Sequence, residues 1–374
     1  FVDYMEEIHA RVIFPTKYFG CLMAVFVEQE PITQDRIEQL TGYSKTTISQ
    51  MLKLIQVNFP LKQVKKPGLR KKYYTIDVPP RDFMITFLKM IIDTYQDKTD
   101  FIPPLIEEIR PYTDKHPRFR NFKQFLEKFY EIGTLFLKLT TDTVDEFSNL
   151  IKTGQVKSSE LSNLNLLSSQ ENLEKIYTLL KPPKVPSFFS DQRIMDEKLA
   201  EIYTQFKNKY YQNVRENLIL AGSQTGYART IIGTELLLEQ RPVTQEEIQN
   251  ATHFKRSTVS YILNILLDWK MIQLIKKPGD RKKYYMVIQS WDSRVINRIK
   301  LNIKYAIEVK EKITNLMEKI ELRKPSKENK SLKAFFQHIH HSYEQYEQYF
   351  KLLEVKYLTI RLKDYLEKEK SNLA

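Results

Sequence analysis

The stretch that decides the organisation of this chain is Lys-Lys-Pro-Gly-Leu-Arg-Lys-Lys-Tyr-Tyr at residues 65–74, which returns with one change at residues 276–285. The two copies are 211 residues apart, and the same offset holds without a gap back to Pro31 and Pro242. Residues 31–74 share 17 identities with residues 242–285, too many to arise by chance. The chain therefore contains a tandem duplication.

Each copy places five Lys or Arg around a Pro-Gly pair. Pro at the second and Gly at the third turn position favour a type II turn, because Pro presets φ and Gly accepts a positive φ. The flanking residues are predicted to pair as a hairpin whose basic tip is suited to phosphates. The residues expected to make these contacts are Lys65, Lys66, Gly68, Arg70, Lys71, Lys72, Lys276, Lys277, Gly279, Arg281, Lys282 and Lys283.

The charge of the chain is concentrated in these hairpins. The formal net charge of the 374 residues is +13, and the hairpins supply +9 of it, Asp280 offsetting one positive charge. Charge placed in this way favours a polyanion as the partner, although two solvated basic loops are the plainer alternative. The length leaves room for two or three domains, and the low glycine content, 9 residues, predicts a mostly helical chain.

Cysteine usage and hydropathy exclude several classes of protein. The single cysteine, Cys21, rules out an intramolecular disulfide framework and a Cys-rich zinc site, and we expect it in the core. No apolar run approaches the roughly 20 residues that span a bilayer, and no secretory signal is visible. We therefore expect a cytoplasmic, nucleoid-associated protein with no membrane partner.

A helix, a three-residue turn and a second helix precede each hairpin. Thr33 is predicted to cap a helix at 34–40, and Thr244 with Glu247 has the spacing of a full capping box. His253 stands in the turn where the first copy has Gly42, a tolerable exchange because His visits left-handed φ more readily than most residues. The order of elements is helix, turn, helix and basic hairpin.

The second helix of each copy, about 44–55 in the first, is amphipathic. Its apolar residues fall at i, i+3, i+4 and i+7, which predicts one buried face: Ile48, Met51, Leu52 and Ile55, then Val259, Ile262, Leu263 and Leu266. The opposite face carries small polar groups, amides and cations suited to base edges. Its residues are Ser44, Lys45, Thr46, Thr47, Ser49, Gln50, Lys255, Arg256, Ser257, Thr258, Ser260 and Tyr261. An ordinary solvated face is the alternative, but its repetition before a basic hairpin favours DNA.

This pattern is that of a winged helix, and it resembles one family. Residues 42–52 followed by 66–74 resemble the GbsR-type branch of the MarR family of repressors, and residues 257–260 and 277–285 repeat the match. The resemblance covers about 15–80 and 226–290. It implies a prokaryotic regulator that dimerises through terminal helices, places the second helix in the major groove and the wing beside the minor groove, and responds in some cases to a small molecule. The two copies in one chain depart from the usual single-copy pattern.

The predicted fold class is mainly α with small β-hairpin wings: two winged helix-turn-helix domains flanked by long helices that pack as a pseudo-dimer. The first half is 1–181, with its winged helix at about 15–78. Its further helices are expected at about 80–97, 103–110, 118–139, 142–152 and 169–181. A Pro-rich junction at 182–190 leads to the second half, 191–374. This half has a long helix at 191–221, a winged helix at about 226–288, and two long helices at about 292–323 and 329–368.

The long helices also carry traces of the duplication and two sites that we set aside. At an offset of 213, six residues from Phe122 to Leu139 match residues from Phe335 to Leu352. Three histidines at 338, 340 and 341 have no counterparts in the first copy, and one helix cannot aim all three at one metal ion. A Tyr-rich stripe at 343–350 is more typical of packed core than of a cation cage. We expect no metal, no cofactor and no enzymatic activity.

The sequence favours a sequence-specific regulator that binds double-stranded DNA as a pseudo-dimeric monomer or as a homodimer. The two helices differ where they would meet bases, so the half-sites are expected to differ. The wings are nearly identical, so phosphate contacts are expected to be similar in both copies. Two alternatives remain open: an architectural, chromatin-like DNA-binding protein without sequence choice, and a winged-helix scaffold of the transcription machinery.

Overall fold

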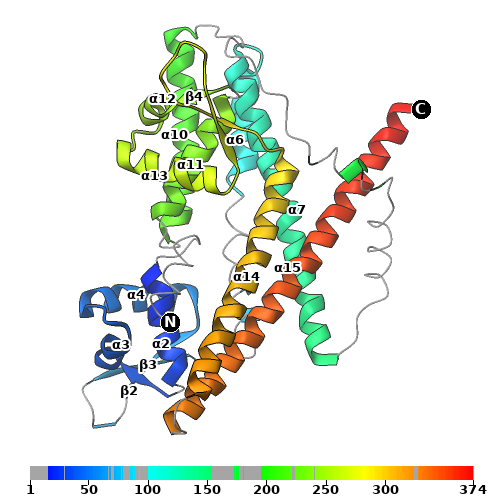
Figure 1. The fold of residues 1–374 in the computed structure, drawn as a ribbon. Helices are drawn as coiled ribbons and strands as arrows, with labels where there is room; N and C mark the ends of the chain where they lie inside the picture. The colour runs from blue at the N-terminus through cyan, green and yellow to red at the C-terminus, as the bar shows by residue number, and fades with distance from the viewer. Residues whose placement is uncertain are drawn as a thin grey trace. The chain divides into compact units, whose positions relative to one another are not determined.

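The computed structural model of the chain is mainly α-helical with two small antiparallel sheets (Figure 1). The residues that it describes are 16–28, 30–65, 67–68, 71–76, 78, 100–153, 195–220, 224–239, 241–322 and 327–373, with isolated positions within 85–92 and 172–180. None of the helices in these ranges is both long and apolar enough to cross a lipid bilayer.

The chain divides into two compact units, and each contains one winged helix. The first unit comprises residues 1–94, 140–156 and 299–354, and the second comprises 95–139, 157–298 and 355–374. Each unit thus contains residues from both sides of the Pro-rich segment at 182–190. That segment lies outside the described residues. So do residues 2–14, whose apolar spacing predicts a helix, and residues 154–168, where the Ser- and Asn-rich sequence predicts a loop that begins at 153. The predicted helices at 80–97 and 169–181 lie mostly outside the described residues.

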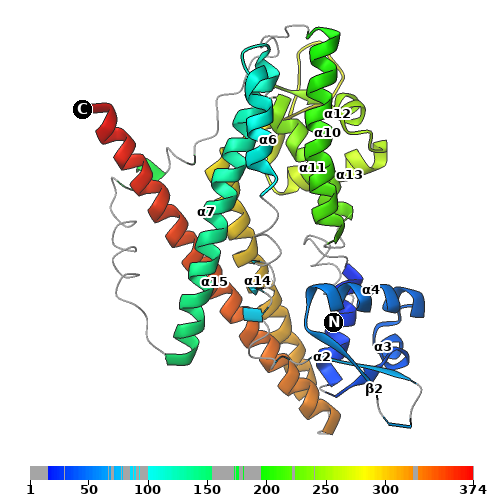
Figure 2. The same ribbon diagram turned by 180° about the vertical axis from the view of Figure 1, so that it is seen from behind.

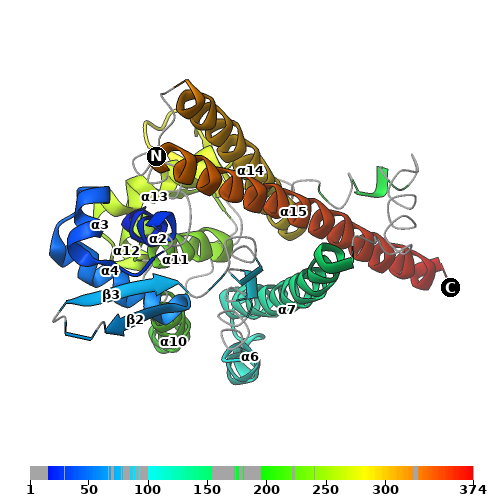
Figure 3. The same cartoon turned by 90° about the horizontal axis from the view of Figure 1, so that it is seen from below.

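The first winged helix has the predicted order of elements. It consists of α2 (Thr16–Glu28), β1 (Ile32–Thr33), α3 (Gln34–Thr41), α4 (Lys45–Asn58), β2 (Leu61–Lys65) and β3 (Lys72–Ile76). The strand order is β1-β3-β2, and the hairpin register runs from Leu61 opposite Ile76 to Lys65 opposite Lys72. Figure 3 shows β2 and β3 side by side as the wing hairpin.

The second winged helix repeats this arrangement. Its elements are α11 (Gln224–Glu239), β4 (Val243–Thr244), α12 (Gln245–Thr252), α13 (Arg256–Asp268), β5 (Ile272–Ile275) and β6 (Tyr284–Val287), with strand order β4-β6-β5. The equivalent order in both copies agrees with the duplication. We call α4 and α13 the recognition helices, and residues 65–74 and 276–285 the first and second wings.

Local sequence explains where these elements begin and turn. The capping box of α12 is confirmed, because the Thr244 side chain accepts from the Glu247 amide and the Glu247 carboxylate accepts from the Thr244 amide. The turn before each recognition helix is left-handed, with φ of 70° at Gly42 and 57° at His253, as predicted. In the second wing Gly279 has φ of 76° and the Asp280 amide donates to the Lys277 carbonyl at 3.1 Å, which closes the predicted turn.

The apolar faces of the recognition helices form the cores of the winged helices. Val259, Ile262, Leu263 and Leu266 are all buried, as are Ile48, Leu52 and Ile55. Met51 differs from the prediction, because it is only half-buried whereas its counterpart Ile262 is fully covered. Cys21 is buried in α2, as expected. The core of the second copy is therefore the more completely covered at this position.

In the second unit the remaining helices build an aromatic core. Helix α6 (Ile102–Ile109) continues into a 3-10 turn, η2 (Arg110–Tyr112), and lies against α10 (Glu197–Leu220) and the first part of α7 (Pro117–Thr153) (Figure 2). Phe119 and Phe122 meet Tyr203 edge-on at 5.4 and 5.9 Å between ring centroids. Residues of the first sequence half thus share one core with α10 of the second half.

Two predicted helix boundaries are wrong. Helix α7 runs unbroken through residues 117–153, because Thr140 and Thr143 are 5% and 0% exposed and their burial outweighs the small helix penalty of a β-branched residue. Helix α10 begins at Glu197 and not at 191, because the Asp196 carboxylate accepts the Leu199 amide at 3.0 Å and caps it there.

The two long C-terminal helices are confirmed as α14 (Trp291–Glu321) and α15 (Lys327–Leu373). The tyrosine stripe of α15 is packed in the first unit, where Tyr343, Tyr349 and Phe350 are 9%, 1% and 7% exposed. The hydroxyls of Tyr305 and Tyr343 lie 3.3 Å apart, and burial raises the pKa of Tyr343 to about 12. These rings form part of a core and not an open cage.

Candidate nucleic-acid interface

Recognition helix α13 presents an exposed face of cations and hydroxyls. Arg256, Ser257 and Ser260 are exposed, Thr258 is half-buried, and the Tyr261 ring is 53% exposed. Lys255 is the exposed N-cap, and its side chain does not cap the helix. The exposed Tyr261 ring and the Arg256 guanidinium, which makes no ion pair with a described residue, suit contact with bases or phosphates.

The second wing extends this basic surface. Lys276, Arg281, Lys282 and Lys283 are exposed, while Lys277 is half-buried. Asp280 holds the tip in shape, since its carboxylate accepts from the Lys282 amide at 2.8 Å and from the Tyr284 hydroxyl at 2.7 Å. The hydrogen bond from Tyr284 lowers the pKa of Asp280, and the same bond raises the pKa of Tyr284. The one acidic residue of this wing is thus turned inward, toward its own backbone.

Recognition helix α4 presents the corresponding face in the first copy. Ser44 caps the helix by accepting from the Thr47 amide at 3.3 Å, and its hydroxyl lies 3.0 Å from that of Thr47. Lys45, Thr46 and Gln50 are exposed, and Thr47 and Ser49 are half-buried. All twelve predicted recognition-helix residues therefore lie at the start or on the solvent side of their helices.

One carboxylate binds two of the cations of the first copy. Asp35, in the first turn of α3, contacts the Lys45 ammonium at 2.7 Å and the Lys71 ammonium at 2.8 Å. Glu38 lies 3.9 Å from the same Lys45 nitrogen. Hydrogen bonds from Lys45 and Lys71 lower the pKa of Asp35 to about 2, and Asp35 in turn raises the pKa of both lysines. This bridge ties α3, the recognition helix and the wing together.

The second copy lacks this bridge. Glu246 occupies the position of Asp35 and lies 3.7 Å from Lys282, the counterpart of Lys71. Arg256, the counterpart of Lys45, makes no ion pair with any residue that the structure describes. Its backbone carbonyl accepts from the Gln245 side chain at 3.0 Å, which fixes the start of the helix while the guanidinium projects into solvent.

The remaining predicted wing residues divide by whether they are described. Lys65 and Lys72 are exposed and face each other across the first hairpin, and Gly68 has φ of 78°. Lys66 and Arg70 lie outside the described residues. Asp35 was missed by sequence reasoning, although an acidic residue at this position in both copies, Asp35 and Glu246, was a signal available in the repeat.

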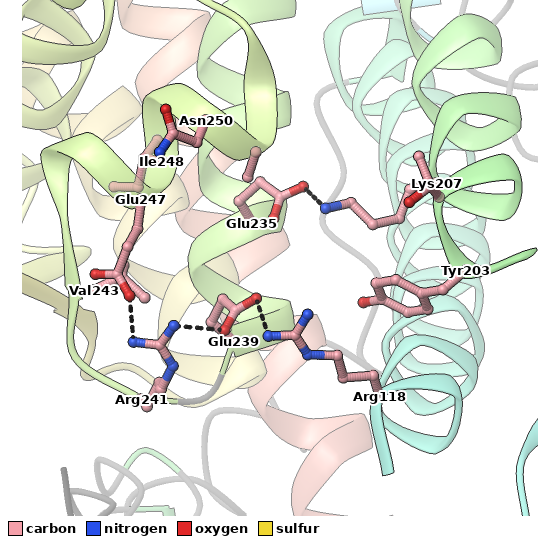
Figure 4. A pocket seen from close by; sticks show the side chains of 12 residues that line it. Arg118, Tyr203, Lys207, Glu235, Glu239, Arg241, Val243, Glu247, Ile248 and Asn250 are labelled. Atoms are coloured by element: carbon pink, nitrogen blue, oxygen red, sulfur yellow. Dashed lines mark ion pairs between the residues drawn. The ribbon is translucent and has the colours of Figure 1, made fainter. Parts of the chain in front are cut away.

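A charged pocket of about 380 Å³ lies in the second unit, beside α12 (Figure 4). Arg241 pairs with Glu239 at 3.2 Å and with Glu247 at 2.8 Å, and Arg118 reaches Glu239 at 3.6 Å. On the other side Lys207 pairs with Glu235, which is 2% exposed. The lining thus joins α7, α10 and α11 to the first helix of the second helix-turn-helix.

No group of three or more His, Cys, Asp and Glu in the described part of the chain has the geometry to hold a metal ion. Of the three histidines of α15, His338 is exposed, while His341 lies 3.1 Å from the Gln345 amide and 3.5 Å from the Glu344 carboxylate.

Comparison with solved structures gives a likeness over part of the chain. No protein-family model and no curated protein matches the chain. A solved structure described as the crystal structure of a transcriptional regulator matches with a TM-score of 0.31 and 16% identity, over 40% of this chain and 96% of that one. A similarity this low identifies neither a family nor an activity, so the resemblance to GbsR-type repressors stays a prediction.

Proposed function

We propose that this chain is a sequence-specific regulator of transcription that binds double-stranded DNA through its two winged helices. Each recognition helix enters a major groove, and each wing lies on the phosphates beside the minor groove. The side chains that face bases are Lys45, Thr46 and Gln50 in one copy and Arg256, Ser257 and Tyr261 in the other.

One observation carries this proposal. The exposed face of α13 combines two hydroxyls, an exposed tyrosine ring and a guanidinium that pairs with no acidic residue in the described part of the chain. The second wing exposes Arg281, Lys282 and Lys283. Cations on a hairpin suit phosphates, which position a protein on the duplex, whereas the mixed groups of a helix face suit base edges, which specify sequence. Both kinds of group occur together in each copy.

Fluorescence anisotropy with a labelled duplex tests the proposal. The two wings carry ten Lys and Arg residues between them. If about six to eight of these residues contact phosphates, log affinity should fall with log salt concentration with a slope of roughly −5 to −7. A slope near zero, or no binding at about 50 mM salt, would remove DNA from the account and leave a winged-helix scaffold as the better description.

Sequence choice is tested separately from affinity. A pool of random duplexes, selected through several rounds and sequenced, should converge on a preferred site that the chain binds roughly 10³-fold or more tightly than random DNA. An architectural protein would bind the pool without enrichment, and it would bend or bridge the duplex instead.

We further propose that the charged pocket takes the small-molecule effector that the family resemblance implies. The pocket is lined by acidic and basic side chains, which suits a small ligand with one positive and one negative group. Such a ligand would replace the ion pair between Glu239 and Arg241 with its own ion pairs to these two residues. Because α12 contributes Glu247 to the lining, occupation of the pocket would act on the first helix of the second helix-turn-helix. Arg241→Ala should abolish a ligand-induced shift in melting temperature.

A further inference from the structure

Two lysines from different elements of the first winged helix share one acidic partner. Lys45 begins α4, Lys71 lies at the end of the wing loop, and the two oxygens of Asp35 take one ammonium each at 2.7 and 2.8 Å. All three side chains keep 40–66% of their surface exposed, so the bridge lies on the surface and not in the core. These are the cations at the junction of recognition helix and wing.

A phosphate at this junction would compete with Asp35 for both ammonium groups. Neutralising one phosphate with a lysine releases a condensed counterion, which strengthens binding and steepens its salt dependence. Binding through lysines that are already paired with a carboxylate releases fewer counterions from the DNA, and the carboxylate itself repels the phosphate. The first winged helix therefore gains less from sequence-independent contacts than its count of lysines indicates.

The second winged helix provides the matched position. Glu246 lies 3.7 Å from Lys282, and Gln249 stands where the first copy has Glu38, so α12 carries one carboxylate at the two positions where α3 carries two. The near-identity of the two wings predicts equal phosphate affinity, but these ion pairs argue for inequality. The difference comes from α3 and α12, which precede the wings in sequence.

We propose that Asp35 is a specificity-determining residue of the first winged helix, withholding Lys45 and Lys71 from phosphates so that this copy holds DNA only where its base contacts fit. The second copy, whose Arg256 has no acidic partner within the described ranges, supplies most of the sequence-independent affinity. This inference rests on the proposed DNA-binding function. It predicts that the bridge opens on specific DNA and stays closed on random DNA.

The test uses Asp35→Asn in the full chain, with Glu246→Gln as the matched control. Exposed ion pairs contribute little to stability, so both variants should fold, and circular dichroism melting checks that they do. On a random duplex at about 0.1 M salt, Asp35→Asn should strengthen binding roughly 5–10-fold and steepen the salt slope by about one, because one more phosphate is neutralised. Glu246→Gln removes the same charge and should change affinity less than about twofold.

A second comparison shows whether Asp35 acts through the lysines. In a chain that carries Lys45→Ala and Lys71→Ala, the gain from Asp35→Asn should fall to the size of the Glu246→Gln effect. The ratio of affinities for selected and random duplexes should drop in Asp35→Asn alone.

Two results would overturn the inference. Weaker binding by Asp35→Asn would mean that the carboxylate positions its lysines for DNA. Equal gains in the two variants would mean that only the overall charge matters. If the wild-type chain binds no DNA, the proposed function fails first, and that failure is distinct from the failure of the inference.

Discussion

The two winged helices share one order of elements, one sheet topology and nearly the same wing, yet they differ in how their charges are arranged. In the first, Asp35 gathers a lysine from the recognition helix and another from the wing. In the second, Asp280 is bound within the wing tip and Arg256 is left without an acidic partner among the described residues. The two copies keep the same order of elements, and differences at a few acidic positions determine which of their cations are held in ion pairs.

The cores offer the comparison with the largest expected effect. Ile262 is fully covered in the second copy, whereas Met51 at the same position of the first copy is half-buried. Ile262→Ala should therefore lower the free energy of unfolding by about 2–5 kcal/mol, and Met51→Ala by about 1–2 kcal/mol. Both tryptophans, Trp269 and Trp291, belong to the second unit, so tryptophan fluorescence in urea measures the unfolding of this unit in the Ile262→Ala variant. Hydrogen exchange of α4 amides follows Met51→Ala, and equal losses would contradict the difference in burial.

The recognition helices offer the next comparison. Arg256 can take the two acceptors of a guanine through its planar fork, whereas Gln50 of the first copy suits adenine and its counterpart Tyr261 does not. Arg256→Ala should cost about 1–3 kcal/mol at one half-site, and Gln50→Ala should relax preference by a similar amount at the other. On a random duplex, where the bridge stays closed, Lys45→Ala should cost less than about threefold, because Asp35 already neutralises Lys45. Selected-sequence profiles measure the two half-site effects, and anisotropy with a random duplex measures the third.

If Arg256→Ala and Gln50→Ala relaxed the same bases, the two copies would not read separate half-sites. If Lys45→Ala cost as much as Arg256→Ala, the bridge to Asp35 would not restrain Lys45 in solution.

Features of the two winged helices could be predicted from the sequence where the interacting residues lie close together in the chain. The repeat at residues 65–74 and 276–285, the apolar spacing around Ile48 and Val259, and the Thr244–Glu247 capping box are local patterns. The structure confirms the two hairpins, the buried helix faces except at Met51, and the capping box. The bridge at Asp35 joins residues 10 and 36 positions away on two other elements, so no local period encodes it.

Helix α7 shows the opposite limit. The predicted break at residues 140–141 does not occur, because Thr140 and Thr143 are buried and the helix continues through them. Local propensity is a weak guide where packing supplies the larger free energy. For the same reason the half-burial of Met51 could not be read from its place in the periodic pattern.

The second wing yields a smaller effect on DNA. Arg281 is exposed beside the tip that Asp280 closes, in a position to contact a phosphate. Arg281→Ala should weaken all duplex sequences by a similar factor, roughly 5–10-fold at about 0.1 M salt, and make the salt slope less steep by about one. Anisotropy titrations at several salt concentrations measure both quantities. A loss confined to one sequence would instead place Arg281 on a base.

The turn before each recognition helix yields the smallest effect. His253 adopts φ of 57°, a left-handed conformation that costs a non-glycine residue about 1 kcal/mol, while Gly42 accepts φ of 70° without strain. His253→Gly should raise the stability of the second unit by about 0.5–1 kcal/mol, and Gly42→Ala should destabilise the first winged helix by about 1 kcal/mol. Urea unfolding followed by tryptophan fluorescence checks the first. A loss of stability in His253→Gly would show that its imidazole makes a stabilising contact.

The number of chains bound to one DNA site shows whether both recognition helices on that site come from the same chain. If one chain presents both unlike recognition helices, light scattering after gel filtration should give the mass of a single chain, 44.6 kDa, free and as one chain per duplex when bound. A mass near twice that value would show a homodimer, with four winged helices available for one operator.

If one chain binds two unlike half-sites, the selected-sequence profile of the wild-type chain should show both of them. A homodimer with one reading helix per chain presents identical side chains to both halves of its operator, which favours a palindrome. The account predicts a preferred site with two halves of different sequence, one enriched in guanine opposite Arg256 and the other in adenine opposite Gln50. A perfectly palindromic preferred site, or recovery of random sequence, would contradict it.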